Sequence, residues 1–447
     1  MFIRIPGLLS NCLSLSANPM PRRTERGVYA GMTKAFPLCL GLLLAVALGH
    51  ASAAETENWV RFRGPDGSGR SNQTGLPVKF DSSSVVWKTP LKGGGNSSPV
   101  FWNDRIFLTS ALDEGKQRVV LCISATDGKI LWEQTAWTGT PERSHEKNGW
   151  ATASCCTDGQ FVYASFGKAG LHCYTVDGKH VWSQQLGEFL SATRRGTAAS
   201  PILAGNLVIL NGDSESDPFL FGIDKLTGKT VWKADRPARE GYSTPVLIDV
   251  DGHQELVLNG EQFIAGYEPA TGKLLWSCKS FAGRGEPLPA VGKGVLYVVN
   301  GLPGDVYAVR PGGSGDVTHS HMVWHTPRRG GRDEPSPLLV DNFLLVSNMA
   351  GICSCYDAVT GKELWKQRLG GPIAASPFTA EGRAYFLYED GEVLVLQPGT
   401  QPKELARNTF GATPGEIFRA SPTPCHGQIL IRSDKMLYCI GAASPTH

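Results

Sequence analysis

The sequence predicts an all-β protein, an eight-bladed β-propeller of four-stranded antiparallel blades. Three observations predict it: a motif ending in tryptophan recurs along the chain, a Ser-Pro marker or a relative of it opens each unit, and no helical periodicity of useful length occurs beyond residue 54. The tryptophans of successive units lie 41 to 50 residues apart, which leaves room for four short strands in each unit. Units of this length and content are typical of propeller blades.

The recurring motif combines turn chemistry with a large aromatic side chain. Asp224–Trp232 reads DKLTGKTVW, Glu268–Trp276 reads EPATGKLLW, and Asp357–Trp365 reads DAVTGKELW. The glycine takes a positive φ at no steric cost, and the acidic residue can bond to turn amides. Each copy is therefore expected to form a hairpin whose tryptophan packs on a neighbouring unit. The structural positions of this kind are Trp87, Trp132, Trp182, Trp232, Trp276, Trp324 and Trp365, with Gly228, Gly272 and Gly361.

The markers give the number of blades. They stand at positions 98, 153, 200, 244, 288, 336, 376 and 421. The unit that begins at Ser421 is too short for four strands, whereas Val85–Pro90 has the form of an outermost strand. We expect this N-terminal strand to complete the last blade, which removes the free sheet edges. A seven-bladed ring is the alternative.

The composition is that of a protein with a real core and no nucleic-acid footprint. Of the 447 residues, 41% are hydrophobic, and the formal net charge is +2. Residues 1–54 carry five basic residues and one acid, so the rest of the chain is close to neutral. A near-neutral body argues against nucleic-acid binding. We expect a monomer.

The N-terminus has the pattern of a secretory leader. Met32–Lys34 is a short basic region, Leu38–Leu48 is apolar, and Ala51–Ala53 offers small residues for cleavage. The apolar run is too short for a membrane span, so we expect no transmembrane helix in the mature chain and a periplasmic or otherwise exported location. The predicted divisions are a leader at 1–54 (signal peptide at about 32–54, with 1–31 interpreted as an over-extended start), an N-terminal extension at 55–84, the propeller at 85–441, and a tail at 442–447.

Nine cysteines follow residue 54, and an odd number excludes complete internal pairing. Four of them occupy one repeat-equivalent position, which holds glycine or alanine in other units. A position that accepts these three residue types is predicted to be small and buried. Its occupants are Cys122, Cys173, Cys355, Cys439, Gly222, Gly266 and Ala308.

The TGKxxW motif and the Ser-Pro markers resemble the pyrroloquinoline-quinone (PQQ) repeat family of eight-bladed propellers over roughly residues 59–441. The opening segment Trp59–Pro65, which reads WVRFRGP, resembles a secreted bacterial branch of PQQ-binding-like propellers. That branch is similar in architecture to BamB, the outer-membrane assembly factor, and to quinoprotein alcohol dehydrogenases. The repeat's name does not imply a bound quinone.

Candidate binding residues lie in the loops that precede the markers, because such loops ring one mouth of a propeller's channel. The position two residues before each marker is variable, and its polar members can converge on a ligand or satisfy one another. These positions are Asn96, Ala151, Ala198, Tyr242, Glu286, Glu334, Ala374 and Arg419.

A charged loop at residues 142–148 precedes the second unit. In the resembled branch a His-x-Lys-Asn segment stands here, and His145, Lys147 and Asn148 match it. The loop can bind an anionic or sugar-like ligand, or it can pack against Arg194 and Arg195. A second charged loop spans residues 328–334, with similar ambiguity.

No CxxCH, GxSxG or HExxH motif occurs. The first hypothesis is therefore an exported, non-catalytic binding or scaffold module of the cell envelope, with an envelope protein, peptide or polysaccharide as partner and no metal or cofactor. The alternative is a PQQ- and calcium-dependent alcohol or sugar dehydrogenase, with Glu286 or Glu334 as base. Some quinoprotein dehydrogenases carry a ring disulfide between adjacent cysteines, but an extended strand at Cys155-Cys156 would point the two sulfurs apart.

Overall fold

The computed structural model describes residues 57–442, except 191–192, 217, 238, 240, 280–284, 302–303, 329–331 and 333. The described residues all lie within one compact unit, Ala53–His447. The predicted leader and most of the predicted tail lie outside the described residues.

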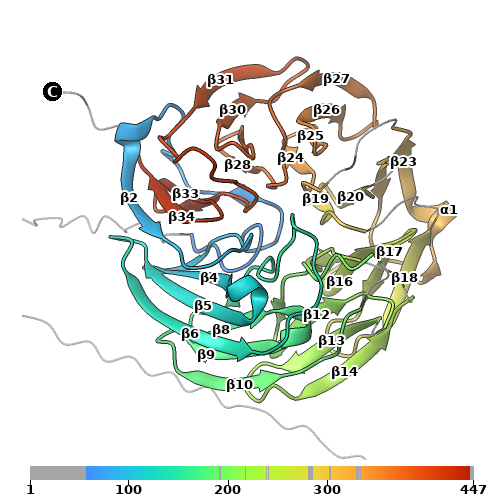
Figure 1. Ribbon diagram of the computed structural model, residues 1–447. Coiled ribbons are helices and arrows are strands. Elements are labelled where there is room, and N and C mark those ends of the chain that lie inside the picture. Colours follow the sequence, from blue (N-terminus) through green and yellow to red (C-terminus); the bar gives the residue numbers. More distant parts are fainter. Residues whose placement is uncertain are drawn as a thin grey trace, which may run out of the picture. The chain divides into compact units, whose positions relative to one another are not determined.

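The described residues form eight sheets arranged around a common centre (Figure 1). Blade 1 contains β3 (Val100–Trp102), β4 (Arg105–Leu112), β5 (Gln117–Ser124) and β6 (Ile130–Thr138). Blade 2 contains β7 (Cys156–Thr157), β8 (Phe161–Ser165), β9 (Leu171–Thr175) and β10 (His180–Gln184). Blade 3 contains β11 (Ile202–Ala204), β12 (Leu207–Gly212), β13 (Phe219–Asp224) and β14 (Thr230–Asp235). Blade 4 contains β15 (Val246–Val250), β16 (His253–Gly260), β17 (Phe263–Tyr267) and β18 (Leu274–Lys279).

The second half of the ring repeats this order. Blade 5 contains β19 (Ala290–Gly292), β20 (Val295–Val299), β21 (Val306–Val309) and β23 (Met322–Thr326). Blade 6 contains β24 (Leu338–Val340), β25 (Phe343–Ser347), β26 (Ile352–Asp357) and β27 (Glu363–Arg368). Blade 7 contains β28 (Phe378–Ala380), β29 (Arg383–Leu387), β30 (Val393–Gln397) and β31 (Lys403–Asn408). Blade 8 contains β32 (Thr423–Cys425), β33 (Gln428–Arg432), β34 (Met436–Ile440) and β2 (Val85–Pro90).

The predicted ring closure is confirmed. Strand β2 pairs antiparallel with β34, which places Trp87 opposite Cys439 and joins the start of the propeller to its last blade (Figure 1). The eight-bladed prediction is therefore right, and the seven-bladed alternative is wrong.

Two short strands were not predicted. β1 (Arg70–Ser71) pairs in parallel with β28 and widens blade 7, and β22 (Gly315–Asp316) pairs in parallel with β18 on the outer edge of blade 4. The insertion that supplies β22 also forms α1 (Thr318–His321). Three 3-10 turns lie at Ser82–Ser84, Asp113–Gly115 and Gly167–Ala169.

The tryptophan of each motif docks on the hairpin turn of the next blade. In six blades the indole N–H donates to a backbone carbonyl of that turn, as from Trp182 to Lys225 O at 3.0 Å. The turn glycine lies beneath the ring, since a Cβ added to Gly228 would come within 2.6 Å of Trp182. The full set of donors is Trp87, Trp132, Trp182, Trp232, Trp324 and Trp365.

Trp276 is the exception, and the sequence explains it. Blade 5 replaces the turn motif with a glycine-rich insertion, so the blade after Trp276 has no matching turn. The indole instead donates to Glu255 Oε2 within its own blade, at 2.6 Å. Strand β22 of the insertion pairs alongside, with Gly315 opposite Trp276.

The small buried position lies directly across the ladder from the tryptophan. Its side chain must be small because the indole folds over it. The cross-strand pairs are Cys122 with Trp132, Cys173 with Trp182, Gly222 with Trp232, Gly266 with Trp276, Ala308 with Trp324, Cys355 with Trp365, and Cys439 with Trp87.

The marker hydroxyls form a ring of hydrogen bonds around the channel. The backbone N–H of one marker donates to the hydroxyl of the marker in the next blade, as from Ser154 N to Ser200 Oγ at 2.9 Å. Seven of the eight possible bonds between neighbouring markers are present. The bond from Thr244 is missing because Leu288, the marker of the next blade, has no hydroxyl to accept it. The donors are Ser98, Ser154, Ser200, Leu288, Ser336, Ser376 and Ser421.

The N-terminal extension crosses the channel beneath this ring. Trp59 bridges to Phe101 of blade 1, and Arg61 Nη2 donates to Pro245 O of blade 4 at 2.8 Å. Arg63 reaches the marker prolines of blades 6 and 7, with Pro337 O at 3.0 Å and Pro377 O at 3.1 Å. Both arginines are buried. The segment therefore plugs the channel on one side of the marker ring.

Candidate functional site

A cavity of about 330 Å³ lies above the marker ring. Its lower part is lined by Phe62 of the plug and by marker residues, and its upper part by the loops that precede the markers. Because Arg61 and Arg63 hold the plug in place, the cavity is a blind pocket at one mouth of the channel.

The structure brings nine of the ten predicted binding residues to this cavity. Seven of the eight predicted positions before the markers also line it, and Ala151 does not. The marker of blade 2 is Ser154, one residue later than predicted, so Thr152 takes this position and lines the cavity. Arg194 does not line the cavity, and its side chain is exposed. The nine residues are Asn96, His145, Lys147, Asn148, Arg195, Tyr242, Glu286, Glu334 and Arg419.

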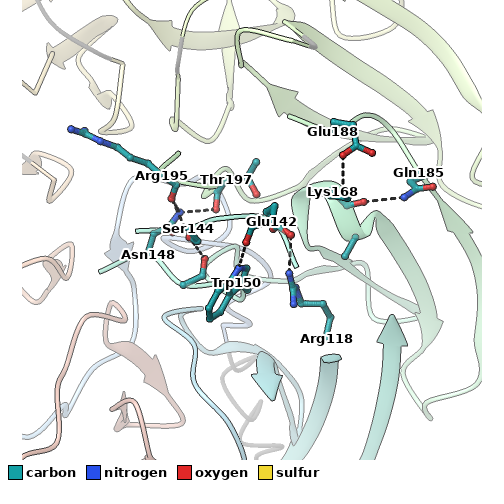
Figure 2. Close-up of polar contacts among 12 residues, drawn as sticks. Arg118, Glu142, Ser144, Asn148, Trp150, Lys168, Gln185, Glu188, Arg195 and Thr197 are labelled. Atoms are coloured by element: carbon teal, nitrogen blue, oxygen red, sulfur yellow. Dashed lines mark hydrogen bonds and ion pairs between the residues drawn. The ribbon is translucent and has the colours of Figure 1, made fainter. Parts of the chain in front are cut away.

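The loop that carries His145 and Lys147 is held by its own polar side chains (Figure 2). Asn148 Nδ2 donates to Arg195 O at 2.7 Å and to Thr197 O at 3.2 Å. Ser144 Oγ also donates to Arg195 O, at 3.1 Å. These bonds tie the loop before blade 2 to the loop before blade 3.

A buried arginine anchors the base of the same loop (Figure 2). Arg118 Nη2 lies 3.0 Å from Glu142 Oε2, and Trp150 Nε1 donates to Glu142 O at 2.8 Å. The guanidinium also lies over the Trp137 ring, 5.1 Å from its centroid. Burial lowers the pKa of Arg118, and the nearby Glu142 carboxylate opposes this shift. These contacts fix the base of the loop, and its charged tip lies at the cavity.

Asn96, from the loop before blade 1, positions the loop at residues 142–148. Its Nδ2 donates to Lys147 O at 2.8 Å and to Asn148 O at 3.0 Å. The side chain is therefore already occupied by the loop, and it fixes the backbone from which Lys147 extends.

The cavity charges form two clusters, each built around a glutamate. Glu286 Oε1 lies 3.2 Å from Arg332 Nη2 and 3.8 Å from Arg195 Nη1. Burial raises the pKa of Glu286, and Arg332 acts against this rise. Glu334 lies at the edge of this cluster, 3.9 Å from Arg332 Nε.

The second cluster links distant parts of the ring. Glu389 Oε1 lies 3.5 Å from Lys147 Nζ and 3.5 Å from Arg419 Nε. Lys147 comes from the loop before blade 2, Glu389 from blade 7, and Arg419 from the loop before blade 8. The pairing therefore closes one side of the mouth.

Phe62, Met349 and Glu389 were not predicted as site residues. Phe62 and Met349 line the cavity, and Glu389 pairs with the lining residues Lys147 and Arg419. Met349 and Glu389 lie in loops between the second and third strands of blades 6 and 7. In an antiparallel four-stranded blade these loops lie on the same face as the loops before the first strand. Strand alternation was therefore a usable signal for both. Nothing in the local sequence indicates that Phe62 lies in the channel.

The nine described cysteines are buried and unpaired. Cys155 packs in the core between blades 1 and 2, and Cys156 in the core between blades 2 and 3, so their sulfurs lie on opposite faces of the blade. Burial raises the pKa of Cys155 to about 12 and that of Cys156 well above its ordinary value. Neither is a reactive thiolate at neutral pH.

The acids of the cavity do not fit a calcium–quinone site. Calcium takes six to eight oxygen ligands, and carboxylates are the main protein donors. Here Glu286 faces two arginines and Glu334 faces one, so a cation placed at either acid would meet guanidinium groups. Among the described residues, no group of three or more His, Cys, Asp or Glu side chains is arranged to hold a metal ion.

Fold and repeat together define the class of protein. Eight four-stranded blades, six of which dock a tryptophan on the turn of the next blade, form a propeller of PQQ-like repeats. A family model described as outer membrane protein assembly factor BamB matches residues 71–147, 116–286 and 302–401, which is more than half of the chain. The protein belongs to this family.

Its curated relatives include both an enzyme and assembly factors. The chain is 24% identical over 346 residues to tetrathionate hydrolase of Acidithiobacillus ferrooxidans, covering 70% of this chain and 62% of that protein. It is 21% identical over 287 residues to BamB of Yersinia pestis, covering 60% and 67%. It is 26% identical over 199 residues to BamB of Legionella pneumophila, covering 43% and 49%. The chain thus spans less than two thirds of the hydrolase.

Two solved structures show the same fold. BamB from Moraxella catarrhalis superposes with a TM-score of 0.59 at 16% identity, covering 79% of this chain and 98% of that one. The computationally designed Ika8 protein superposes with a TM-score of 0.53 at 12% identity, covering 80% and 99%.

Proposed function

We propose that this protein is an exported, non-catalytic binding propeller of the cell envelope, which receives its partner in the plugged cavity at the channel mouth. The observation that carries the proposal is the cavity itself. The repeated segments of the blades form the ring. The loops before the markers, which differ in sequence from blade to blade, converge on one charged pocket that the plug closes at its lower end. Sites of this kind, concave with a few converging polar groups, are the usual places for ligands.

The family description and the chain's pattern support the envelope location. The matching family is described as an outer membrane protein assembly factor, and two of the curated relatives carry that name. No helix in the described part of the chain has the length and apolarity of a membrane span. An envelope protein, a peptide or a polysaccharide is the partner class that this setting favours.

The proposal is tested by crosslinking from inside the cavity. A photo-reactive phenylalanine analogue replaces Met349, which lines the cavity, and in a control protein it replaces Val231, which is exposed on the outer strand β14. After irradiation of an envelope fraction, the cavity position should capture a discrete species that the control does not. Mass spectrometry then identifies the adduct as protein or glycan. Capture from both positions alike would contradict binding in the cavity.

Catalysis is tested separately. The purified protein is incubated with PQQ and calcium and assayed for dye reduction with alcohols and sugars, and in parallel with tetrathionate, the substrate named for one relative. We expect no turnover in either assay. Turnover in either one would overturn the non-catalytic proposal.

A further inference from the structure

The floor of the cavity presents hydroxyl hydrogens. Six marker residues line it, and each of their oxygens accepts one backbone N–H from a marker in the preceding blade. A hydroxyl has one hydrogen to donate in addition to its acceptor capacity. The contacts of the described residues include no acceptor for these six hydrogens, so they are available to a ligand. The six residues are Ser98, Ser200, Thr244, Ser336, Ser376 and Ser421.

The walls carry donors that the protein leaves unused. Arg195 Nη1 and Arg419 Nε are buried and have no hydrogen-bond partner. Each lies near a glutamate, at 3.8 Å from Glu286 and at 3.5 Å from Glu389, but neither contact has hydrogen-bond geometry. A buried donor without an acceptor is energetically costly, and a ligand oxygen would remove that cost.

The charge of the lining favours an anion. Among the described lining residues, four are lysine or arginine and two are carboxylates, and Glu389 adds a third carboxylate beside Lys147 and Arg419. The excess is a single positive charge, so it suits a ligand with one negative charge better than a polyanion. The charged residues are Lys147, Arg195, Arg332, Arg419, Glu286 and Glu334.

The cavity also has an apolar side. Phe62, Leu288, Met349 and Ala374 line it, and an inorganic anion would leave these side chains against water. The volume of about 330 Å³ is at the lower end of the range for small-molecule sites. A ligand that fills it therefore joins an anionic group to a compact apolar body.

We propose that the cavity binds an organic carboxylate with a small apolar body, whose carboxylate oxygens accept from Arg195, Arg419 and the hydroxyls of the floor. This inference rests on the proposed binding function and names the ligand chemistry. Guanidinium groups and carboxylates match in geometry, and such charge-assisted bonds are stronger than neutral ones. The carboxylate comes either from a free acid or from the C-terminus of a peptide.

Two matched probe pairs distinguish these sources. 3-Phenylpropionate and its amide represent the free acid, and N-acetyl-phenylalanine and its amide represent a peptide C-terminus. Calorimetric titration should show that at least one acid binds at least tenfold more tightly than its own amide. Equal binding of acid and amide in both pairs would overturn the inference, and so would failure of both acids to bind the folded protein. Saturation by inorganic phosphate at the same affinity would also overturn it, since that would show an ion site only.

Point variants of the arginines test which of them bind the carboxylate. Arg195→Ala and Arg419→Ala should each weaken the acid by about tenfold or more, whereas Arg194→Ala, at the exposed neighbour, should change the affinity less than twofold. Arg195→Lys keeps the charge and should recover part of the loss. Thermal melting of each variant verifies that it is folded. Equal loss in Arg194→Ala and Arg195→Ala would overturn the assignment.

Failure of this inference is distinguishable from failure of the proposed function. If neither acid binds while the Met349 probe still captures a discrete species, the cavity is a binding site with a different ligand chemistry. If neither result is positive, the proposed function itself fails.

Discussion

The turn glycines show most directly how one residue serves the whole ring. Gly228 has a φ of 74°, and a Cβ there would come within 2.6 Å of the Trp182 ring of the preceding blade. The residue therefore meets two demands, a left-handed backbone and close contact with an indole. Turn propensity predicts the first demand from sequence, but only the packing of two blades reveals the second.

Gly228→Ala should destabilise the protein by about 2–4 kcal/mol, because it combines about 1 kcal/mol of backbone strain with 1–3 kcal/mol of overpacking. Gly205→Ala is the matched control, since Gly205 has a φ of 57° and a Cβ added there would meet nothing within 4 Å. Denaturant unfolding of both variants separates the two effects. Equal losses would show that contact with Trp182 contributes nothing.

The buried cysteines make stability sensitive to alkaline pH. Burial raises the pKa of Cys122, Cys155 and Cys173 to about 12 in each case, from an ordinary value of 9.0. Because the folded pKa is the higher one, the stability from these thiols is fully present below about pH 9. It is lost as the pH rises toward 12, where the unfolded thiols ionise and the folded ones do not.

We therefore expect the free energy of unfolding to fall between about pH 9 and pH 11, as measured by urea titration at each pH. Cys122→Ala should reduce this fall at little cost at pH 7, because the equivalent position in blade 5 is Ala308. In the native protein at pH 8, thiol reagents should react slowly with all nine cysteines. Rapid labelling of any of them would contradict the assigned burial.

At the scale of the element, the marker links each blade to the next. The Ser-Pro pairs predict the start of each blade, and the innermost strands do begin directly after them, as β3 does after Ser98-Pro99. They do not indicate that the hydroxyls join one another in a ring. The reason is that six of these bonds join residues 40 to 56 positions apart and the seventh, from Ser421 to Ser98, joins residues 323 positions apart, so their closeness follows only from the packing of the blades around the ring.

Ser200→Ala removes the acceptor for the buried Ser154 N–H and should cost about 1–3 kcal/mol. Ser200→Thr is the control, since Thr244 accepts the same bond from Ser200 in the next blade. Thermal unfolding should rank wild type and Ser200→Thr together, above Ser200→Ala. A stability of Ser200→Ala equal to that of wild type would show that the ring of bonds does not contribute.

The loops contrast with these regular elements. The approach of Lys147 to Glu389 and Arg419 joins segments from the loop before blade 2, from blade 7 and from the loop before blade 8. Position relative to the markers was enough to identify most of the residues at the mouth. It was not enough to identify their partners, because a pairing across the channel depends on side-chain reach and on the number of blades.

At the scale of the whole molecule, the plug decides whether the channel is open. Arg63 bonds to carbonyls of blades 6 and 7, and Arg61 to a carbonyl of blade 4, so one short segment holds blades that are distant in sequence. Burial lowers the pKa of both arginines to about 10, so they stay charged at neutral pH.

Arg63→Ala should destabilise the fold by about 2 kcal/mol or more, because it leaves the Pro337 and Pro377 carbonyls without their donor. Arg70→Ala is the control, at an exposed arginine seven residues later. Urea unfolding should show the difference, and hydrogen exchange should rise at blades 6 and 7 only in Arg63→Ala. Equal stability of the two variants would mean that the plug does not brace the ring.

The sequence by itself determined the class of fold, the number of blades, the closing strand and most residues of the mouth, because each of these repeats or stands at a constant offset from a repeat. Only the tertiary structure decided which indole covers which glycine, that the marker hydroxyls form a ring, and that Trp59 to Arg63 plug the channel. Those features are contacts between segments far apart in the chain, and no local sequence pattern indicates them. The chemistry of the cavity belongs to the same group, since its unused donors become apparent only when all eight blades are in place.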